Sequence, residues 1–533
     1  MNRSALYLVI LTAGILLCPA VAPAQVATPQ ENGLIPKTDT IYINGPGTVN
    51  NLSTESTGVA IAANGNVIVG WEDDGSTVFD DLEAVWTLFD GQGSWITPDT
   101  QITSLQEAGS ITTKFLSYFR SNGSATPAST AWGPKIKANL FGDGIGMGAT
   151  AFSLGLEIPE LADINIDAGG GGDFPAVQLL DNLGQPIAVL SGLSDADAEP
   201  EGDVRIADWE YLANGNLVIV GENRQQQDLV DRFGGSAPAN HTVYRILDSS
   251  GAEVRGLNLL SEAKVGSGMW HGVGVTQNGF AARYELGGRQ TVRIFDNDGN
   301  PVSGDIDIAT LTGEPNTAQG GRGDSAGFHG NGKDAYVIAN TGGGQPWVTV
   351  LNADGSLRWF RNAVAEFPEM TSDRIDAAID AQGRVIVAFG DPTGHELVGI
   401  GLVRARVFDP AGEPVADPFF VSEREDPTNP LVDEARRPRL AWRGRTVAIL
   451  WESRNDPTNP NYDWEVTLRL FEAAVSETVL EITGGGTQVT LTWEGGGNLE
   501  QAASPGGAWN AVVGAVSPHT MTATAGQAFF RVR

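Results

Sequence analysis

The feature that most constrains this chain is a short phrase that returns along most of its length. In each copy an apolar run is broken by a tight turn and resumes, and a second alternating run ends in a turn of the Asp-x-x-Gly type. Copies begin near Val59, Glu210, Val273, Ala377 and Pro438. A period of roughly 40 to 60 residues that contains only strands and tight turns is the signature of a β-propeller.

Counting the paired strands gives seven units between residues 57 and 477, and six or eight units are the alternatives. Apolar and polar residues alternate within the units, as expected of strands, and glycine accepts the positive φ that tight hairpins require. The sequence therefore predicts an all-β fold, a seven-bladed β-propeller over residues 57–477 with an insertion near residues 100–125. Residues 25–56 precede it, and Ile41 to Ile43 could add a strand that closes the ring against the last blade.

The character of the chain changes at residue 478, where short alternating runs are separated by glycines. This pattern predicts a small C-terminal β-sandwich over residues 478–533. Its distinctive residues are Thr492-Trp493-Glu494, Leu499-Glu500, Trp509 and the terminal Phe529-Phe530-Arg531. They resemble those of the β-sandwiches appended to many bacterial exported proteins, and the resemblance implies a role outside the cytoplasm.

The first 24 residues have the organisation of a signal peptide. Arg3 supplies a positive start, Ala5 to Leu17 form a short apolar core, and Ala22-Pro23-Ala24 fits the small-residue rule for cleavage. We therefore expect a secreted or periplasmic protein, cleaved after Ala24. Cys18 is the only cysteine and leaves with this segment, so the mature chain is expected to have no disulfide and no thiolate metal site.

The net charge of −32 argues against binding to a nucleic-acid backbone, because such binding needs clustered Lys and Arg. No later stretch reaches the roughly 18 apolar residues of a membrane span. We expect neither nucleic acid nor membrane as a partner, and we expect a monomer. Some carboxylates could bind Ca²⁺, with Asp296 and Asp298 as the candidates. Pro301 stands where a calcium loop needs glycine, which favours a hairpin turn instead.

In a propeller, the residues just before each first apolar run line the mouth of the central channel, where a polar pocket could form. The candidates for ligand binding there are Arg205, Trp270, Arg374, Arg437 and Arg439. The candidates for acid–base chemistry are Asp208, Glu210, Asp373, His271 and His329. The two histidines lie at equivalent aromatic-His-Gly positions. The alternative is structural, since a charged residue at the same position of each repeat often ties neighbouring blades together.

This arrangement resembles the sialidase-type propellers in outline, and the resemblance implies an arginine cluster that holds an acidic sugar. No full Asp-box, Ser-x-Asp-x-Gly-x-Thr-Trp, is present, and the nearest sequence runs from Asp73 to Thr77. Because no catalytic motif stands out, the sequence favours an exported non-catalytic binding or scaffold protein that presents a propeller face to an extracellular glycan or protein. The alternative is a glycan-processing hydrolase or lyase with an Arg, Asp and His pocket at the propeller mouth.

Overall fold

The computed structural model describes residues 7–11, 33–43, 57–73, 83–97, 109–110, 131–153, 172–191, 204–223, 241–261, 272–318, 326–370, 372, 374–391, 402–422, 434–454, 465–473, 480–485, 488–493, 499–502, 509–512, 515, 519–522 and 526–532. The chain divides into two compact units, one of residues 31–473 and one of residues 1–30 with 474–533.

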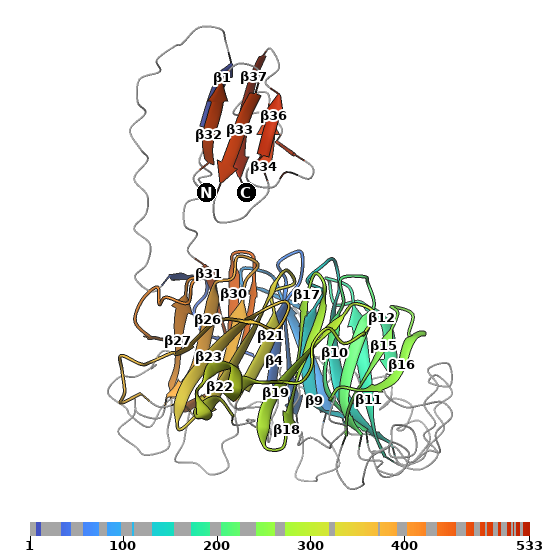
Figure 1. Ribbon diagram of the computed structural model, residues 1–533. Helices are drawn as coiled ribbons and strands as arrows, with labels where there is room; N and C mark the ends of the chain where they lie inside the picture. Colours follow the sequence, from blue (N-terminus) through green and yellow to red (C-terminus); the bar gives the residue numbers. More distant parts are fainter. Residues whose placement is uncertain are drawn as a thin grey trace. The chain divides into compact units, whose positions relative to one another are not determined.

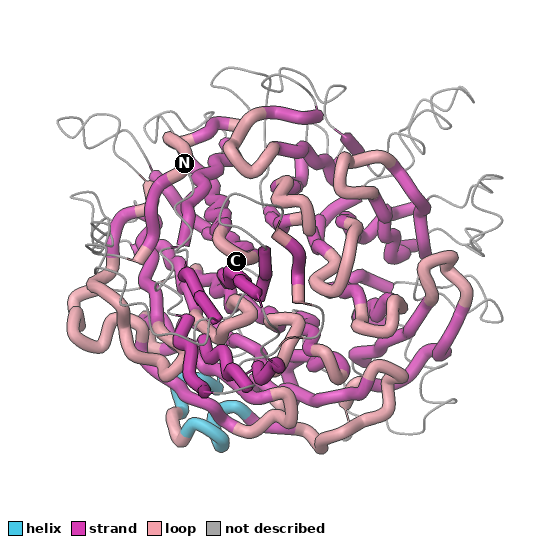
Figure 2. Tube along the Cα trace, turned by 90° about the horizontal axis from the view of Figure 1, so that it is seen from above, coloured by secondary structure: helices cyan, strands magenta, loops and turns pink. Residues whose placement is uncertain are grey.

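The larger unit is a β-propeller (Figures 1 and 2). Its described residues form seven antiparallel sheets, in which each strand pairs with the next along the chain. The innermost strands, β4, β9, β13, β17, β21, β25 and β29, contact one another in this order, and β29 contacts β4 to complete a ring. The predicted all-β propeller class is therefore confirmed.

The bounds of the first four sheets follow the chain order. The first contains β4 (Thr57–Ile61), β5 (Val67–Asp73), β6 (Glu83–Phe89) and β7 (Trp95–Thr97), with β8 (Gly109–Ser110) also paired to β6. The second contains β9 (Ala131–Ala138), β10 (Ile145–Ser153), β11 (Gly172–Leu180) and β12 (Pro186–Ser191). The third contains β13 (Val204–Tyr211), β14 (Leu217–Asn223), β15 (His241–Leu247) and β16 (Glu253–Leu259). The fourth contains β17 (Gly272–Thr276), β18 (Gly279–Leu286), β19 (Arg289–Asp296) and β20 (Ile306–Asp307).

The remaining three sheets complete the ring. The fifth contains β21 (Ala326–Gly330), β22 (Ala335–Gly342), β23 (Gln345–Asn352) and β24 (Leu357–Asn362). The sixth contains β25 (Ile375–Ile379), β26 (Val385–Asp391), β27 (Leu402–Phe408) and β28 (Phe419–Phe420). The seventh contains β29 (Glu434–Arg443), β30 (Thr446–Arg454) and β31 (Glu465–Ala473).

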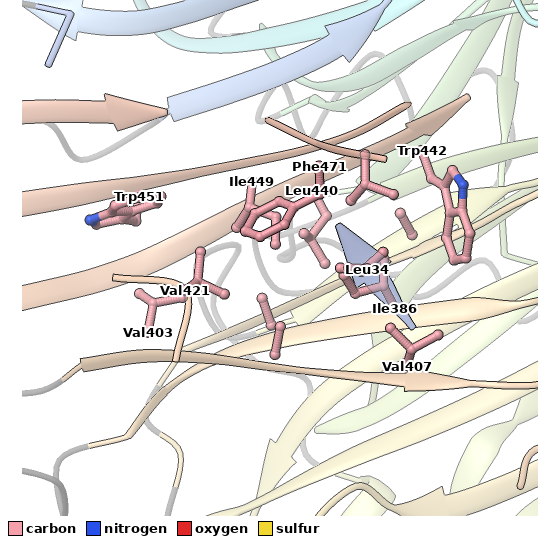
Figure 3. Packing of buried hydrophobic residues seen from close by; sticks show 14 of the residues in the cluster. Leu34, Ile386, Val403, Val407, Val421, Leu440, Trp442, Ile449, Trp451 and Phe471 are labelled. Atoms are coloured by element: carbon pink, nitrogen blue, oxygen red, sulfur yellow. The ribbon is translucent and has the colours of Figure 1, made fainter. Parts of the chain in front are cut away.

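The seventh sheet is completed by residues from the start of this unit. Both β2 (Leu34–Pro36) and β3 (Ile41–Tyr42) pair antiparallel with β31. Leu34 is fully buried in the core between the sixth and seventh sheets. Figure 3 shows it between Ile386 of β26 and Phe471 of β31. The two ends of the propeller sequence are therefore joined within one sheet, which ties the first and last repeats together.

The repeated Asp-x-x-Gly phrase forms the turn between the third and fourth strands of a sheet. In the turn at Asp248, the carboxylate Oδ1 accepts hydrogen bonds from the backbone N–H groups of Ser250 and Ala252, at 2.8 and 2.9 Å. Gly251 has φ of 87°, a left-handed conformation that disfavours other residues. Asp90, Asp181, Asp296 and Asp409 make the same pair of contacts in their own turns.

Helix is nearly absent from the described residues. The short helix α3 (Ile308–Thr312) begins at the N-cap Asp307, whose side chain accepts a hydrogen bond from the Thr310 N–H, and the 3₁₀ helix η3 (Pro315–Ala318) follows it. Within the described residues, no helix has the length and apolar character that a membrane crossing requires. Of the predicted insertion near residues 100–125, only β8 lies within the described residues.

The smaller unit contains two antiparallel sheets among its described residues. One has the order β1 (Tyr7–Leu11), β37 (Gly526–Val532), β34 (Leu499–Ala502) and β35 (Asn510–Ala511). The other has the order β32 (Leu480–Gly485), β33 (Gln488–Trp493) and β36 (His519–Thr522). Leu491, Leu499, Phe529 and Phe530 are buried. Strand β1 comes from the predicted signal peptide, whose cleavage stays a prediction.

Candidate binding site on the propeller axis

The site is built from equivalent positions on the seven inner strands. The register of each hairpin, together with the side of the sheet on which its buried residues lie, identifies one equivalent residue on each inner strand. These seven residues form one level of the ring. In ring order this level holds Ala60, Lys137, Glu210, Gly274, His329, Ala378 and Ala441. Three members are therefore ionisable, and the other four carry a methyl group or no side chain at all.

Lys137 holds two carboxylates of the next sheet. Its Nζ lies 3.0 Å from Asp208 Oδ2 and 3.1 Å from Glu210 Oε1. The lysine side chain is 10% exposed and both acidic side chains are 8% exposed, so the ion pairs are buried. Burial alone would lower the pKa of Lys137, but Asp208 and Glu210 more than offset it and raise that pKa above its usual value. The ammonium group therefore stays charged at any ordinary pH.

His329 and Asp376 form a second pair across the ring. His329 Nε2 lies 3.0 Å from Asp376 Oδ1, and the imidazole is 32% exposed while the carboxylate is buried. Burial opposes ionisation of Asp376, but His329, Arg439 and the backbone N–H of Leu440 together lower the pKa of this acid. The acid is therefore ionised, and the histidine is the most accessible member of the group.

The two pairs share one architecture. Asp208 accepts hydrogen bonds from the N–H of Trp209, its neighbour in sequence, and from the N–H of Val273 on the next inner strand, β17. Asp376 does the same with Ala377 and with Leu440 on β29. In both halves of the ring, a basic side chain of one sheet, an acid of the second and an amide of the third are linked. This tie between blades is the structural role that the repeats suggested.

Glu210 has no ionisable counterpart in the second pair. Asp376 is equivalent to Asp208, and the position equivalent to Glu210 is occupied by Ala378. Burial raises the pKa of Glu210 to about 7, although Lys137 opposes the shift. Its Oε1 contacts Lys137, whereas Oε2 is buried and has no hydrogen-bond partner among the described residues. A buried carboxylate oxygen without a partner is costly, so Glu210 is retained against an energetic penalty.

Arginines extend the charged group. Arg283 of β18 is buried, and burial lowers its pKa to about 10 against the opposing effect of Asp208 and Asp376. Arg439 Nε donates a hydrogen bond to the Thr57 carbonyl oxygen, at 3.2 Å, which links the seventh sheet to the first. Arg437 has φ of 50°, a left-handed conformation rare for such a residue, and its Nη1 lies 3.5 Å from Glu452 Oε1.

The structure brings together part of the predicted site. Asp208, Glu210, His329 and Arg439 belong to one charged group, whereas Arg437 is buried against Glu452. Arg374 is half-buried just before β25, and its carbonyl oxygen accepts a hydrogen bond from the Gly390 N–H. Trp270, His271 and Asp373 lie outside the described residues, as does the side chain of Arg205.

Three members of the group were not predicted from the sequence. Lys137 lies in the least regular repeat, where the second strand begins after a longer turn. Asp376 lies within the strand and not before it. Arg283 lies on the second strand of its sheet, away from the positions just before the first apolar runs. Aligning every repeat on its hairpin would have found Lys137, and the position of Asp208 would have indicated Asp376.

The calcium candidates lie in a hairpin turn. Asp296 Oδ1 accepts hydrogen bonds from the N–H groups of Asp298 and Asn300, and Oδ2 accepts one from Asn300 Nδ2 at 2.9 Å. Both oxygens thus serve the turn, and calcium binding there stays a prediction. Within the described residues, no group of three or more His, Cys, Asp or Glu side chains is arranged to hold a metal ion.

Comparison with known proteins gives likeness in structure alone. No protein-family model and no curated protein matches the sequence. A protein of unknown function from Dyadobacter fermentans has a TM-score of 0.42 at 12% identity, covering 83% of this chain and 99% of its own. The intramolecular trans-sialidase from Ruminococcus gnavus has a TM-score of 0.42 at 9% identity, covering 82% and 97%. The β-propeller domain of the Trilobed protease from Pyrococcus furiosus has a TM-score of 0.36 at 9% identity, covering 77% and 98%.

Proposed function

We propose that this chain is an exported, non-catalytic binding protein that presents one face of its propeller to an extracellular glycan or protein. The observation that carries the proposal is that the connections between strands are longer at one end of the sheets than at the other. In five of the seven sheets the second and third strands are joined by a long segment: residues 74–82, 154–171, 224–240, 392–401 and 455–464. All five segments lie outside the described residues, but because the strands are antiparallel, the described strand ends that flank them lie at the same end of their sheets.

The opposite end is made mostly of short turns, and its exceptions are residues 297–305 and 409–418, between the third and fourth strands of the fourth and sixth sheets. The first and second strands of the third sheet are joined by residues 212–216, and the third and fourth strands by 248–252. Turns of this kind are held by side-chain hydrogen bonds, as at Asp248. Long connections on a rigid scaffold are where binding residues concentrate, whereas short closed turns mainly join strands. The end of the sheets from which the long connections leave is thus the expected binding face.

The charged group on the axis supports binding in preference to catalysis. Asp208 and Asp376 each have a cationic partner and two backbone donors, an arrangement that stabilises the ring. Asp376 is a poor proton donor, because His329, Arg439 and the Leu440 N–H lower its pKa. Only Glu210 departs from this pattern.

The chain itself suggests the experiment. In the fourth sheet the second and third strands are joined by Gly287-Gly288 alone. Replacing residues 224–240, or separately 154–171, with Gly-Gly would shorten the proposed binding face without changing a strand. We expect the mature chain, residues 25–533, to bind members of a glycan array or a protein panel, and the shortened variants to lose that binding.

A matched control lies at the other end of the sheets. Leu183 is 57% exposed in the turn between β11 and β12, so Leu183→Glu changes the surface there and should leave binding unchanged. Equal loss in this control and in the shortened variants would contradict the proposal, as would full binding by both shortened variants.

A second candidate function is favoured by one observation. A carboxyl group whose pKa is about 7, like that of Glu210, is poised to act as a general acid near neutral pH, and His329 is accessible on the same level. In a glycan hydrolase or lyase, Arg205 and Arg374 would then hold an acidic sugar. The test is turnover: activity on any glycan that is abolished by Glu210→Gln would establish the enzyme and reject the binding protein.

A further inference from the structure

The turn between β9 and β10, residues 139–144, lies at the short-turn end of the sheets, opposite the long connections. It is the longest of the turns that join a first strand to a second. The equivalent turns Asn64-Gly65-Asn66 and Asn214-Gly215-Asn216 are polar, and an asparagine of each bonds to the next sheet along the ring. The β9–β10 turn instead carries Leu140 and Phe141, which are both partly buried. Such apolar residues need a surface to cover them, and here that surface belongs to other sheets.

Leu140 reaches across the ring from its own sheet. A Cβ added at Gly332, in the turn between β21 and β22 of the fifth sheet, would stand 3.0 Å from Leu140 Cβ. Leu140 and Phe141 also pack against the buried cluster shared by the third and fourth sheets. In a ring of seven sheets, none is farther from the second than the fifth. A turn of the second sheet that touches the fifth must therefore cross the axis.

Arg443 approaches the same turn from the other direction around the ring. It is the last residue of β29 in the seventh sheet, and its Nη1 donates to the carbonyl oxygens of Ile61, at 3.3 Å, and Asn139, at 2.9 Å. Its Nη2 donates to the Gly142 carbonyl oxygen at 3.4 Å. Burial lowers the pKa of Arg443, although Asp143 opposes this shift. The guanidinium thus links the seventh, first and second sheets at a place where solvent is scarce.

The turn is also held from within and from its side. Asn139 Nδ2 donates to the Asp143 carbonyl oxygen at 3.0 Å, and Asn139 Oδ1 accepts a hydrogen bond from the Phe141 N–H at 3.0 Å. Asn182, in the turn between β11 and β12, accepts a hydrogen bond from the Gly144 N–H at 2.9 Å. Its Nδ2 donates to Asp143 Oδ1 at 2.6 Å. These bonds fix the turn, so its apolar residues are kept over the axis.

The charged group on the axis lies directly inside this turn. Lys137, Glu210 and His329 are each the next-to-last residue of an inner strand, at the end where the strand enters its turn. Because residues 139–144 cross the axis at that end, they cover the charged group from the short-turn side.

We propose that residues 139–144 form a plug, locked by Arg443, that closes the central channel of the propeller at the short-turn end. A ligand of the axis then enters from the end where the long connections leave. The solvent that reaches His329, whose imidazole is 32% exposed, comes from that same end. An arginine suits the lock, because its planar fork of donors serves three carbonyl oxygens at once, which the compact ammonium of a lysine cannot match.

A disulfide across the axis tests the position of the plug. Residues 25–533 contain no cysteine, so Leu140→Cys with Gly332→Cys introduces a single pair. The 3.0 Å between Leu140 Cβ and a Cβ at Gly332 is close to the roughly 3.8 Å between the Cβ atoms of a disulfide. We expect this pair to close on mild oxidation, seen as a shift in mobility without reductant. The control pair, Leu183→Cys with Gly332→Cys, uses an exposed turn of the second sheet and should stay reduced.

Hydrogen exchange tests the lock and needs no cysteine. Arg443→Ala removes the hydrogen bonds to the turn, and the loss of one charged hydrogen bond shifts an opening equilibrium about tenfold or more. We therefore expect the peptide that contains residues 139–144 to exchange about tenfold faster in this variant. Arg445→Ala is the matched control, because Arg445 lies in the same hairpin turn but pairs with Glu472 of its own sheet. Exchange of residues 139–144 should be unchanged in the control.

Modification of His329 tests the direction of access. Diethyl pyrocarbonate modifies accessible neutral imidazoles, and mass spectrometry of the peptide that contains His329 gives the rate at this residue. We expect the same rate with the disulfide closed and with it reduced, because the reagent arrives from the end opposite the plug.

The outcomes separate the plug from the route of entry. No crosslink above the control pair, or equal exchange in Arg443→Ala and Arg445→Ala, would overturn the plug. Slower modification of His329 in the crosslinked form, or none in either form, would overturn entry from the long-connection end. If Gly332→Cys does not fold, as judged by thermal melting, the exchange comparison decides the plug by itself. These measurements use no ligand, so the proposed function stands or fails separately, on the binding panels.

Discussion

Replacing Lys137 with methionine is the sharpest perturbation of the axial group. Methionine has a similar length but no charge, so Asp208 and Glu210 lose their shared cation while their side chains stay 8% exposed. Removing one partner of a buried ion pair costs about 3 to 5 kcal/mol, because the remaining charge is neither solvated nor paired. We expect a loss of this size in the unfolding free energy of the propeller, measured by urea unfolding followed by tryptophan fluorescence.

The size of this loss should depend on pH. The folded state holds the Glu210 proton up to about pH 7, whereas the unfolded chain releases it near 4.5. A raised folded pKa of an acid means that stability falls as pH rises from the unfolded value to the folded one. Without Lys137 the folded pKa of Glu210 rises further and this window extends above pH 7. The substitution should therefore cost more at pH 8 than at pH 5.

A double variant separates charge from packing. Adding Glu210→Gln to Lys137→Met removes one of the two stranded carboxylates and should recover about 1 kcal/mol or more. A cost below about 1 kcal/mol for the single change would refute the buried-pair argument. The same conclusion would follow if the cost were independent of pH, or if the two substitutions were simply additive.

The other predictions concern close packing, titration and ions. Gly327→Ala would place a methyl group 1.9 Å from Asp376 Oδ1, so we expect thermal melting to show a large loss of stability, whereas Gly142→Ala, whose methyl would meet only Asn139 Nδ2 at 3.5 Å, should change little. Glu210→Gln removes the titration of that carboxyl, so its unfolding free energy relative to the unmodified chain should rise by about 2.5 kcal/mol between pH 5 and pH 8; a flat difference would contradict the raised pKa. Calcium should raise the melting temperature more than magnesium does, and a site with a Kd a hundredfold below the ion concentration adds about 2.7 kcal/mol. Equal responses to the two ions would mean screening of the net charge of −32.

Turn chemistry explains why the fold was predictable from the sequence. The Asp-x-x-Gly phrase encodes its own structure, since the aspartate caps two backbone N–H groups and the glycine takes the left-handed conformation, as at Asp248 and Gly251. Because these signals lie within a single turn, each regular repeat can be recognised from its own sequence. The same chemistry made Asp296 look like a calcium ligand, because a sequence does not show that both its oxygens are used within the turn.

The axial site was predictable only in part, because its contacts join different repeats. Asp208, Glu210 and His329 were found by their position before or within an inner strand. Lys137 and Asp376 were missed, although Lys137 forms an ion pair with Asp208 and Asp376 forms one with His329. The packing of consecutive sheets brings residues 137 and 208, or 329 and 376, to 3.0 Å. No local pattern within one repeat records which of its residues face a residue of the next repeat.

The most direct test of the account is a glycan and protein binding panel run beside a turnover assay on the same glycans, with the mature chain and its variant lacking residues 224–240. We predict binding that the shortened variant loses, with every glycan recovered chemically unchanged. Release or cleavage of any glycan that a single axial substitution such as Glu210→Gln abolishes would contradict the account and identify an enzyme.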